Sequence, residues 1–273
     1  MLESSRQASR SPLKGLTQTG AILMKFALRF LLLGLPFIVM LDISRAENLP
    51  EFRPALLGHG PRSLINKINV ESLMKRGQRD AVIMFSCFVS SLGQGGYMRV
   101  YRCSPNSELL QNEAMGQCWR AHFEPAVYNH QTTEVMLTGT IVFFVANEKP
   151  HLRIFLNQEN EDIKGAKDFV APQLAFPPGN PKFEGFRFPP GAPGHEAVVA
   201  VSMDCNTMGK ASNAKVDYEY PKGLGFGAQI LDPIPDAVFV PGFRNGKPVA
   251  CHFTMTLISF GARRGSRGMI KSG

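Results

Sequence analysis

Apolar and polar residues alternate along much of the chain, which predicts short strands separated by turns. Residues 80–91 predict a first strand, whose apolar face is formed by Ile83, Phe85, Cys87 and Val89. A glycine-rich turn and a second strand over residues 97–102 follow. Helical spacing of apolar residues predicts a helix over residues 108–120, and a long apolar strand over residues 133–145 closes the unit. The order of elements is therefore strand, strand, helix, strand.

This unit occurs twice. Residues 80–144 match residues 196–260 without a gap when each position is compared with the one 116 further along. The matched positions include turn and loop residues: Gly93 with Gly209, Phe123 with Phe239, Pro125 with Pro241, and Asn129 with Asn245. An internal duplication defines domains before any single element is assigned. We therefore predict two tandem domains, the first over residues 60–148 and the second over residues 195–261.

Chain geometry predicts an α+β fold, in which each ββαβ domain is a small antiparallel sheet with a helix on one face. The helix returns the chain so that the third strand lies beside the first, which gives the strand order 2-1-3. The third strand then has an outer edge without a partner, and such edges bind extended segments of other chains. The expected binding residues are Val135, Leu137, Thr138, Ile141 and Phe143 in the first copy, and Val249, Phe253, Thr254, Met255 and Leu257 in the second.

The segments outside the two copies have their own patterns. Residues 149–194 are polar and then rich in proline and glycine, which predicts an extended linker whose phenylalanines dock on a domain surface. Residues 262–273 are basic and predict a disordered tail.

The N-terminal residues 1–46 have the pattern of a signal peptide, with a basic start, an apolar run and a small-x-small cleavage site. If Met24 is the initiator, residues 1–23 precede the true start. The alternative is an uncleaved helix that anchors the protein in an inner membrane.

Composition restricts the class of partner. Hydrophobic residues make up 44% of the chain and charged residues 19%, as in globular proteins. The net charge of +8 comes from the N-terminal segment and the basic tail, so the body between them is neutral. No basic face interleaved with aromatic residues is evident, and we expect no nucleic-acid partner.

Several short motifs resemble the C-terminal domain of TonB and its TolA-like relatives. The second copy has FVP at 239–241 and NGKPV at 245–249, and the first has KRGQ at 75–78 and FEPA at 123–126. The resemblance covers roughly residues 60–145 and 170–260. It implies a periplasmic or secreted protein of a Gram-negative envelope that binds a protein partner or itself.

The sequence also departs from that family. It has no long Pro-Glu and Pro-Lys spacer, and Ala121 stands where the family commonly has tryptophan, with Trp119 two residues earlier. An accessory role in TonB-dependent transport is the alternative to a simple binding module. A periplasmic hydrolase or redox enzyme is a third hypothesis.

Candidate chemistry is sparse. Cys205 and Cys251 are expected to be neighbours, either as a disulfide or as two buried thiols, and Cys87 could meet Cys118 under the helix. The cysteine and histidine spacings do not suit a metal site. Cys118 and His122 have the spacing of a nucleophile and its base, but the second copy has neither residue. We expect Trp119 in the core, and no enzyme activity, cofactor, metal or small-molecule substrate.

Overall fold

The computed structural model describes residues 49–260 except 166, 181, 184, 188 and 190–195. These residues belong to one compact unit that begins at Leu49. The predicted signal peptide and basic tail lie outside the described residues. Every described strand pair is antiparallel, and the helices are few, so the α+β class with antiparallel sheets is confirmed at that level.

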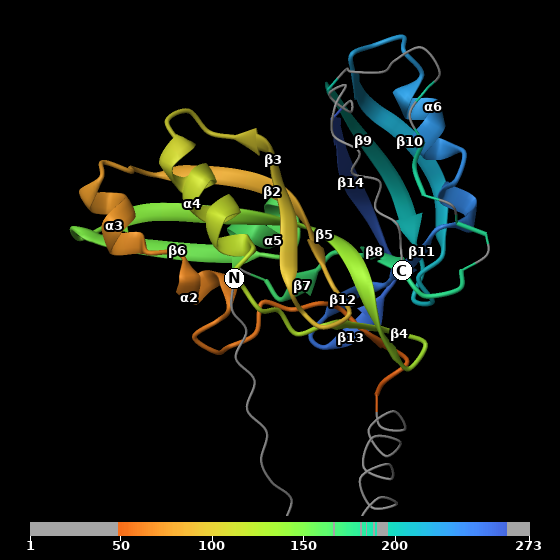
Figure 1. The fold of residues 1–273 in the computed structure, drawn as a ribbon, viewed down its shortest axis with the longest axis horizontal. Coiled ribbons are helices and arrows are strands. Elements are labelled where there is room, and N and C mark those ends of the chain that lie inside the picture. Colours follow the sequence, from red (N-terminus) through yellow and green to blue (C-terminus); the bar gives the residue numbers. More distant parts are fainter. Residues whose placement is uncertain are drawn as a thin grey trace, which may run out of the picture. The chain divides into compact units, whose positions relative to one another are not determined.

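The largest sheet has eight strands (Figure 1). Its strand β2 lies between β3 and β5, and further strands extend it beyond β5. One of these, β11, comes from the second half of the sequence and pairs with β8, which pairs with β5. The eight strands are β1 (Phe52–Arg53), β2 (Ala81–Val89), β3 (Gly95–Cys103), β4 (Ala126–Tyr128), β5 (Gln131–Ala146), β6 (Lys149–Phe155), β8 (Gln173–Phe176) and β11 (Val238–Val240).

Two smaller sheets have three strands each. In one, β9 (Glu196–Cys205) lies between β10 (Ala211–Tyr220) and β14 (Cys251–Phe260). In the other, β12 (Gly242–Arg244) lies between β13 (Lys247–Val249) and β7 (Phe169–Val170). The helices are α2 (Leu64–Lys67), α3 (Val70–Lys75), α4 (Glu108–Cys118), α5 (Asn160–Lys164), α6 (Phe226–Leu231) and the short 3₁₀ turn Ile234–Asp236.

Two apolar cores hold these layers together. In the first, α4 packs on β2 and β3 and buries the face of β2 that the alternation predicted. In the second, α6 packs on β9 and β10, and this core also includes Met136 and Leu174 of the large sheet. The outer face of the large sheet, which points away from α4, therefore takes part in the second core.

The KRGQ motif ends in a buried glutamine that fixes the start of α4. The Gln78 side chain donates to the carbonyls of Arg79 (2.8 Å) and Asn106 (3.0 Å) and accepts from the Leu110 amide (3.0 Å). One side chain thus joins the backbone just before β2, at Arg79, to the backbone at the start of α4, at Asn106 and Leu110.

Residues 116 apart make the same backbone contact at the two turns after the first strand of each copy. The amide of Phe123 donates to the carbonyl of Gly93 at 2.8 Å, and the amide of Phe239 donates to that of Gly209 at 3.0 Å. Both glycines have positive φ, +82° and +71°. A β-carbon on either glycine would overlap the carbonyl oxygen of the matched phenylalanine, so only glycine fits.

The prediction of an extended linker over residues 149–194 is wrong for residues 149–176. These residues form β6, α5, β7 and β8 and belong to the sheets. The buried Gln173 side chain of β8 accepts from the amide of Ala55 (2.7 Å) and donates to its carbonyl (2.9 Å). This polar residue therefore satisfies buried backbone groups instead of lying in a solvated linker.

One ion pair joins this segment to the second copy and gives a testable pH dependence. Arg244 donates to both carboxyl oxygens of Asp162, at 2.9 and 3.1 Å, and the Asp162 side chain is only 10% exposed. These bonds hold the pKa of Asp162 below its ordinary value of 3.8, although burial opposes the shift. We expect Asp162→Asn to lower the free energy of unfolding by about 1–2 kcal/mol at neutral pH.

The sign of the pH dependence follows from the lowered pKa. The ionised carboxylate stabilises the fold above its unfolded pKa, and this contribution disappears as the pH falls through the folded pKa. The free energies of unfolding of the wild-type protein and Asp162→Asn, measured with denaturant, should therefore become equal in acid. Lys167→Ala is the matched control, because its ammonium lies 4.0 Å from the same carboxylate and is 57% exposed. It should change stability by less than about 0.5 kcal/mol, and an equal effect would contradict this account.

Candidate functional site: a cavity beside the large sheet

The predicted binding edge of the first copy is not an edge. One flank of β5 pairs with β2. The other flank pairs with β4 and β8 along residues 131–136 and with β6 along residues 140–146. The chain turns back at Asn147 and Glu148, which both have positive φ, and β6 then covers the flank. The proposed contact residues are buried: Val135, Leu137, Ile141 and Phe143 completely, and Thr138 with 6% exposed.

The predicted edge of the second copy is partly covered. Val249 lies in the separate strand β13, and Phe253 and Met255 are buried with 2% exposed. The carbonyl of Thr254 points away from β9 and accepts from the Gln158 side chain at 3.0 Å. Because the backbone groups of successive residues in a strand point to alternate sides, the N–H and C=O of Thr256 also point away from β9. Thr256 is buried, and β14 approaches β3. The edge-pairing prediction is therefore wrong for the first copy. In the second copy, among the described strands, β14 pairs only with β9 and is the edge strand of its sheet, so there the pairing of its outer flank with another chain stays a prediction.

All five cysteines are free thiols. Cys205 and Cys251 lie directly opposite each other, as predicted, and burial raises their pKa values to about 12 and about 11. A hydrogen bond to Cys118, together with burial, raises the pKa of Cys87, so this second predicted contact is also present. These four cysteines thus pack as small apolar groups, and the buried Cys118 is not available as a nucleophile for His122.

Thiol labelling tests this assignment. In the native protein at neutral pH, we expect only the exposed Cys103 to react rapidly with a thiol reagent such as dithiobis-nitrobenzoate, because burial protects the others. Unfolding without a reductant should release the remaining four. A total of three reactive thiols after unfolding would instead reveal one disulfide.

A cavity of about 720 Å³ lies where the outer face of the large sheet meets the second core. Its floor is formed by apolar side chains of β2, β5 and β8: Phe88, Met136, Leu174 and Phe176. Its other wall comes from the second core: Ala197, Val199, Phe226, Ile230 and Leu257. Ligand sites in proteins are typically apolar cavities of about 300–1,000 Å³ with a few polar groups, so both size and lining are suitable.

Among the described residues, few polar side chains line the cavity, and they are unevenly distributed. Ser86 of β2 lies directly opposite Arg99 of β3, and both line the cavity. Arg187, from the segment that follows β8, contributes a second guanidinium group. The third charged group is Glu134 of β5, whose pKa is raised because partial burial disfavours the carboxylate.

Aromatic rings form a continuous series along the cavity. Trp119 contacts Tyr97, Tyr97 contacts Phe88, and Phe88 contacts Phe176, with ring centroids 4.8, 6.3 and 5.7 Å apart. The expectation of a core position for Trp119 is wrong, because the indole packs over Gly96 and remains 53% exposed. Tyr97 lines the cavity and is equally exposed, so these two rings form an aromatic surface beside the cavity.

Tyr97 also has an unusual backbone. Its φ is +48°, and β3 has a register shift opposite β2 at this point. The matched residue of the second copy, Asn213, has φ of +53° and a similar register shift. Asparagine tolerates this conformation, whereas a bulky side chain adopts it rarely and at a cost. The bulge thus belongs to both copies, but only the first directs an aromatic ring to the cavity.

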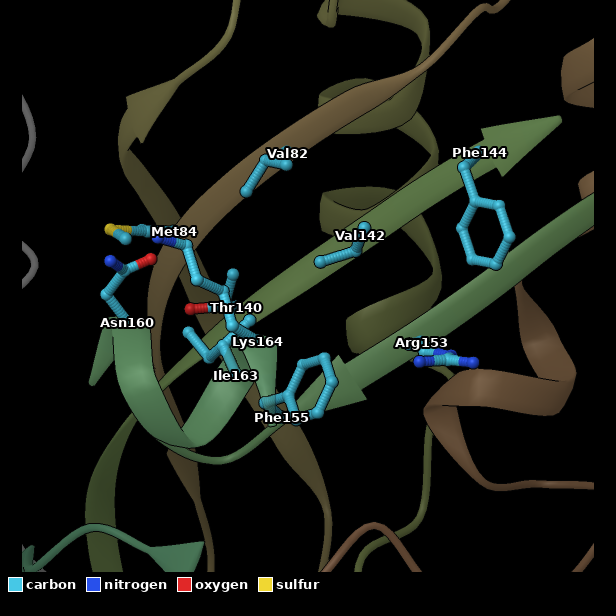
Figure 2. Close-up of a pocket in the computed structure, with 10 residues that line it drawn as sticks. All are labelled: Val82, Met84, Thr140, Val142, Phe144, Arg153, Phe155, Asn160, Ile163 and Lys164. Atoms are coloured by element: carbon cyan, nitrogen blue, oxygen red, sulfur yellow. The ribbon is translucent and has the colours of Figure 1, made fainter. Parts of the chain in front are cut away.

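A smaller pocket of about 360 Å³ lies on the same face of the large sheet, beside α5 (Figure 2). Val82 and Val142 form part of its floor, and the Phe144 ring stands near Arg153, whose guanidinium carbon lies 5.7 Å from the ring centre. Its volume is half that of the larger cavity, so we take the larger cavity as the candidate site.

Of the edge residues predicted from the sequence, only Leu257 lines this cavity. A usable signal was present, however. The face of β2 that points away from α4 carries Val82, Met84 and Phe88, so this strand is apolar on both faces. Such strands are typically covered on both sides.

No protein-family model, curated protein or solved structure matches the chain. Within residues 49–260, as far as they are described, no group of three His, Cys, Asp or Glu side chains could hold a metal ion. No helix in the described part of the chain is long and apolar enough to cross a membrane.

Proposed function

We propose that this protein is an exported, non-catalytic binding protein that holds an apolar small molecule in the 720 Å³ cavity. The observation that carries the proposal is the cavity itself, which is roomy, lined mainly by apolar side chains and bordered by exposed aromatic rings. The N-terminal pattern supports export to the periplasm or beyond.

The proposed scaffold is a tandem pair of TonB-C-like ββαβ units. Three observations support it: the order β3-β2-β5 parallels β10-β9-β14, the turn glycines make matched bonds, and both copies have a strand bulge at the matched residue. The segments that precede the two copies correspond as well. Strand β1 pairs with β4, and β7 pairs with β12, which lies 116 positions after β4. In this scaffold the duplication creates the site, since the first copy and β8 contribute the floor and the second copy contributes the opposite wall.

The lining favours binding over catalysis. Acid–base or nucleophilic catalysis needs two or more reactive groups within hydrogen-bond reach of one another. Among the described residues that line the cavity, none is histidine or cysteine, and Glu134 is the one carboxyl group.

Titration with a neutral apolar dye tests the proposal. N-phenyl-1-naphthylamine fluoresces strongly in apolar surroundings, and we expect it to bind the folded protein saturably, with one molecule per chain. Binding should disappear when the protein is unfolded by denaturant. A linear, unsaturable signal from the folded protein would contradict the proposed function.

A further inference from the structure

Three large apolar side chains are exposed around the turn that joins β2 to β3. Leu92, in the turn, is 81% exposed, and Tyr97 and Trp119 are both half-exposed. The segments that carry them adjoin, because the Gln94 side chain donates to the carbonyl of Trp119 at 2.6 Å and the Trp119 ring contacts Tyr97. Leu92, Tyr97 and Trp119 together are called the apolar patch below.

The second copy shows that the fold does not require these rings. Asn213 stands where the first copy has Tyr97, and Pro235 stands where it has Trp119. Both copies have the strand bulge with positive φ, but the first copy places there a tyrosine, a bulky side chain that rarely adopts this conformation. Strained residues of this kind cluster at binding sites. The apolar patch therefore serves something other than the stability of the unit.

The two rings are held in place by the protein itself. Gly96 leaves room for the indole, since a β-carbon there would approach the Trp119 ring to 3.0 Å. Tyr97 meets Trp119 edge to face, with ring centroids 4.8 Å apart. Side chains that are already fixed lose little conformational entropy when a partner covers them. The apolar patch is therefore pre-organised for binding.

The size of the apolar patch distinguishes between classes of partner. A stable protein–protein interface buries about 800 Å² on each side. A fully exposed aromatic side chain offers about 150–250 Å², and both rings are half buried, so the patch offers roughly 300–400 Å² in all. This area is too small for a stable protein interface. A bilayer needs less, since a single acyl chain already gives weak, reversible attachment.

The apolar patch is continuous with the large cavity, because Tyr97 belongs to both. Under the proposed function the cavity holds an apolar molecule, and such molecules partition from water into membranes. On the basis of that function, we infer that the apolar patch docks the protein on the surface of a phospholipid bilayer, with the cavity beside the membrane. Leu92 enters the boundary between headgroups and acyl chains. Tyr97 and Trp119 lie at headgroup level, where their apolar rings are covered and their polar atoms stay hydrated.

Tryptophan fluorescence tests this inference, because Trp119 is the only tryptophan of the chain and its emission reports on the apolar patch alone. We expect phosphatidylcholine vesicles to shift the emission of the full-length protein to shorter wavelength, and phosphatidylcholine brominated on its acyl chains to quench it. Leu92→Ser removes an exposed side chain that the fold does not bury, and it should weaken vesicle binding about tenfold.

Met208→Ser is the matched control. Met208 occupies the position of Leu92 in the second copy and is also exposed, but Asn213 and Pro235 stand there in place of the two rings. Its loss should leave vesicle binding unchanged, and an equal effect of the two substitutions would overturn the inference.

Two further outcomes separate this inference from other accounts. Sedimentation with vesicles while Trp119 emission stays unchanged would overturn it, because the apolar N-terminal run would then be the attachment. Saturable binding of N-phenyl-1-naphthylamine without any effect of vesicles on Trp119 would also overturn it and leave the proposed function standing. A vesicle-induced shift in a protein that does not bind the dye would support the docking and overturn the proposed function.

Discussion

Replacing Gly209 with alanine should lower the free energy of unfolding by about 3 kcal/mol, and Gly93→Ala should have a similar effect. Two costs add at these positions. A residue with a β-carbon is strained by about 1–2 kcal/mol at φ of +71° or +82°. The new methyl group would also overlap the carbonyl oxygen of Phe239 or Phe123, and relieving such overpacking costs about 1–3 kcal/mol.

Gly246→Ala separates these two costs. Gly246 has φ of +72°, but a β-carbon there would meet nothing within 4 Å. This control should therefore cost only the backbone strain, about 1 kcal/mol. Denaturant unfolding of the three variants measures the differences. Equal destabilisation by Gly209→Ala and Gly246→Ala would show that the contact between turn and phenylalanine is not as tight as described.

Much of the local structure followed from the sequence. The first strand, the helix over 108–120 and the long strand over 133–145 correspond to β2, α4 and β5, within a few residues at their ends. The two strands have clear alternation, and local signals such as the turn glycine Gly93 separate the elements. Short-range patterns of this kind depend little on what the rest of the chain does.

The pairing of strands far apart in the sequence was harder to predict. The hairpin of β5 with β6 depends on a turn at Asn147 and Glu148, which lacks the glycine that usually identifies such turns. The pairing of β8 with β11 joins residues more than 60 positions apart and rests on strands of three or four residues. Because neither signal is visible in a periodicity pattern, a covered strand was predicted as a free edge.

The cavity could be predicted only in outline. The apolar residues on the second face of β2 indicate that something covers this face, but not what covers it. Its polar lining depends on the bulge at Tyr97, which sets which residues of β3 face the cavity beyond it. This shift of register changes the face of Arg99 and Val100 until a second shift before Arg102 restores the pairing, and the sequence of β3 does not specify either shift.

The second large effect is expected from Ser86→Trp. Ser86 is buried and faces the cavity from the middle of β2, so an indole at this position would occupy the volume that the ligand needs. The side chain enters an existing space and leaves the first core under α4 unchanged, since Ser86 is on the other face of the strand. We therefore expect saturable dye binding to be abolished while the far-ultraviolet circular dichroism remains that of the wild-type protein.

Val82→Trp is the matched control, because Val82 is on the same face of the same strand but lines the smaller pocket. Titration of N-phenyl-1-naphthylamine into the wild-type protein and these two variants is the most direct test of the cavity as the binding site. We predict that the wild-type protein and Val82→Trp each bind one dye molecule with similar affinity, and that Ser86→Trp binds none. Undiminished binding by Ser86→Trp, or loss of binding in Val82→Trp alone, would contradict this assignment.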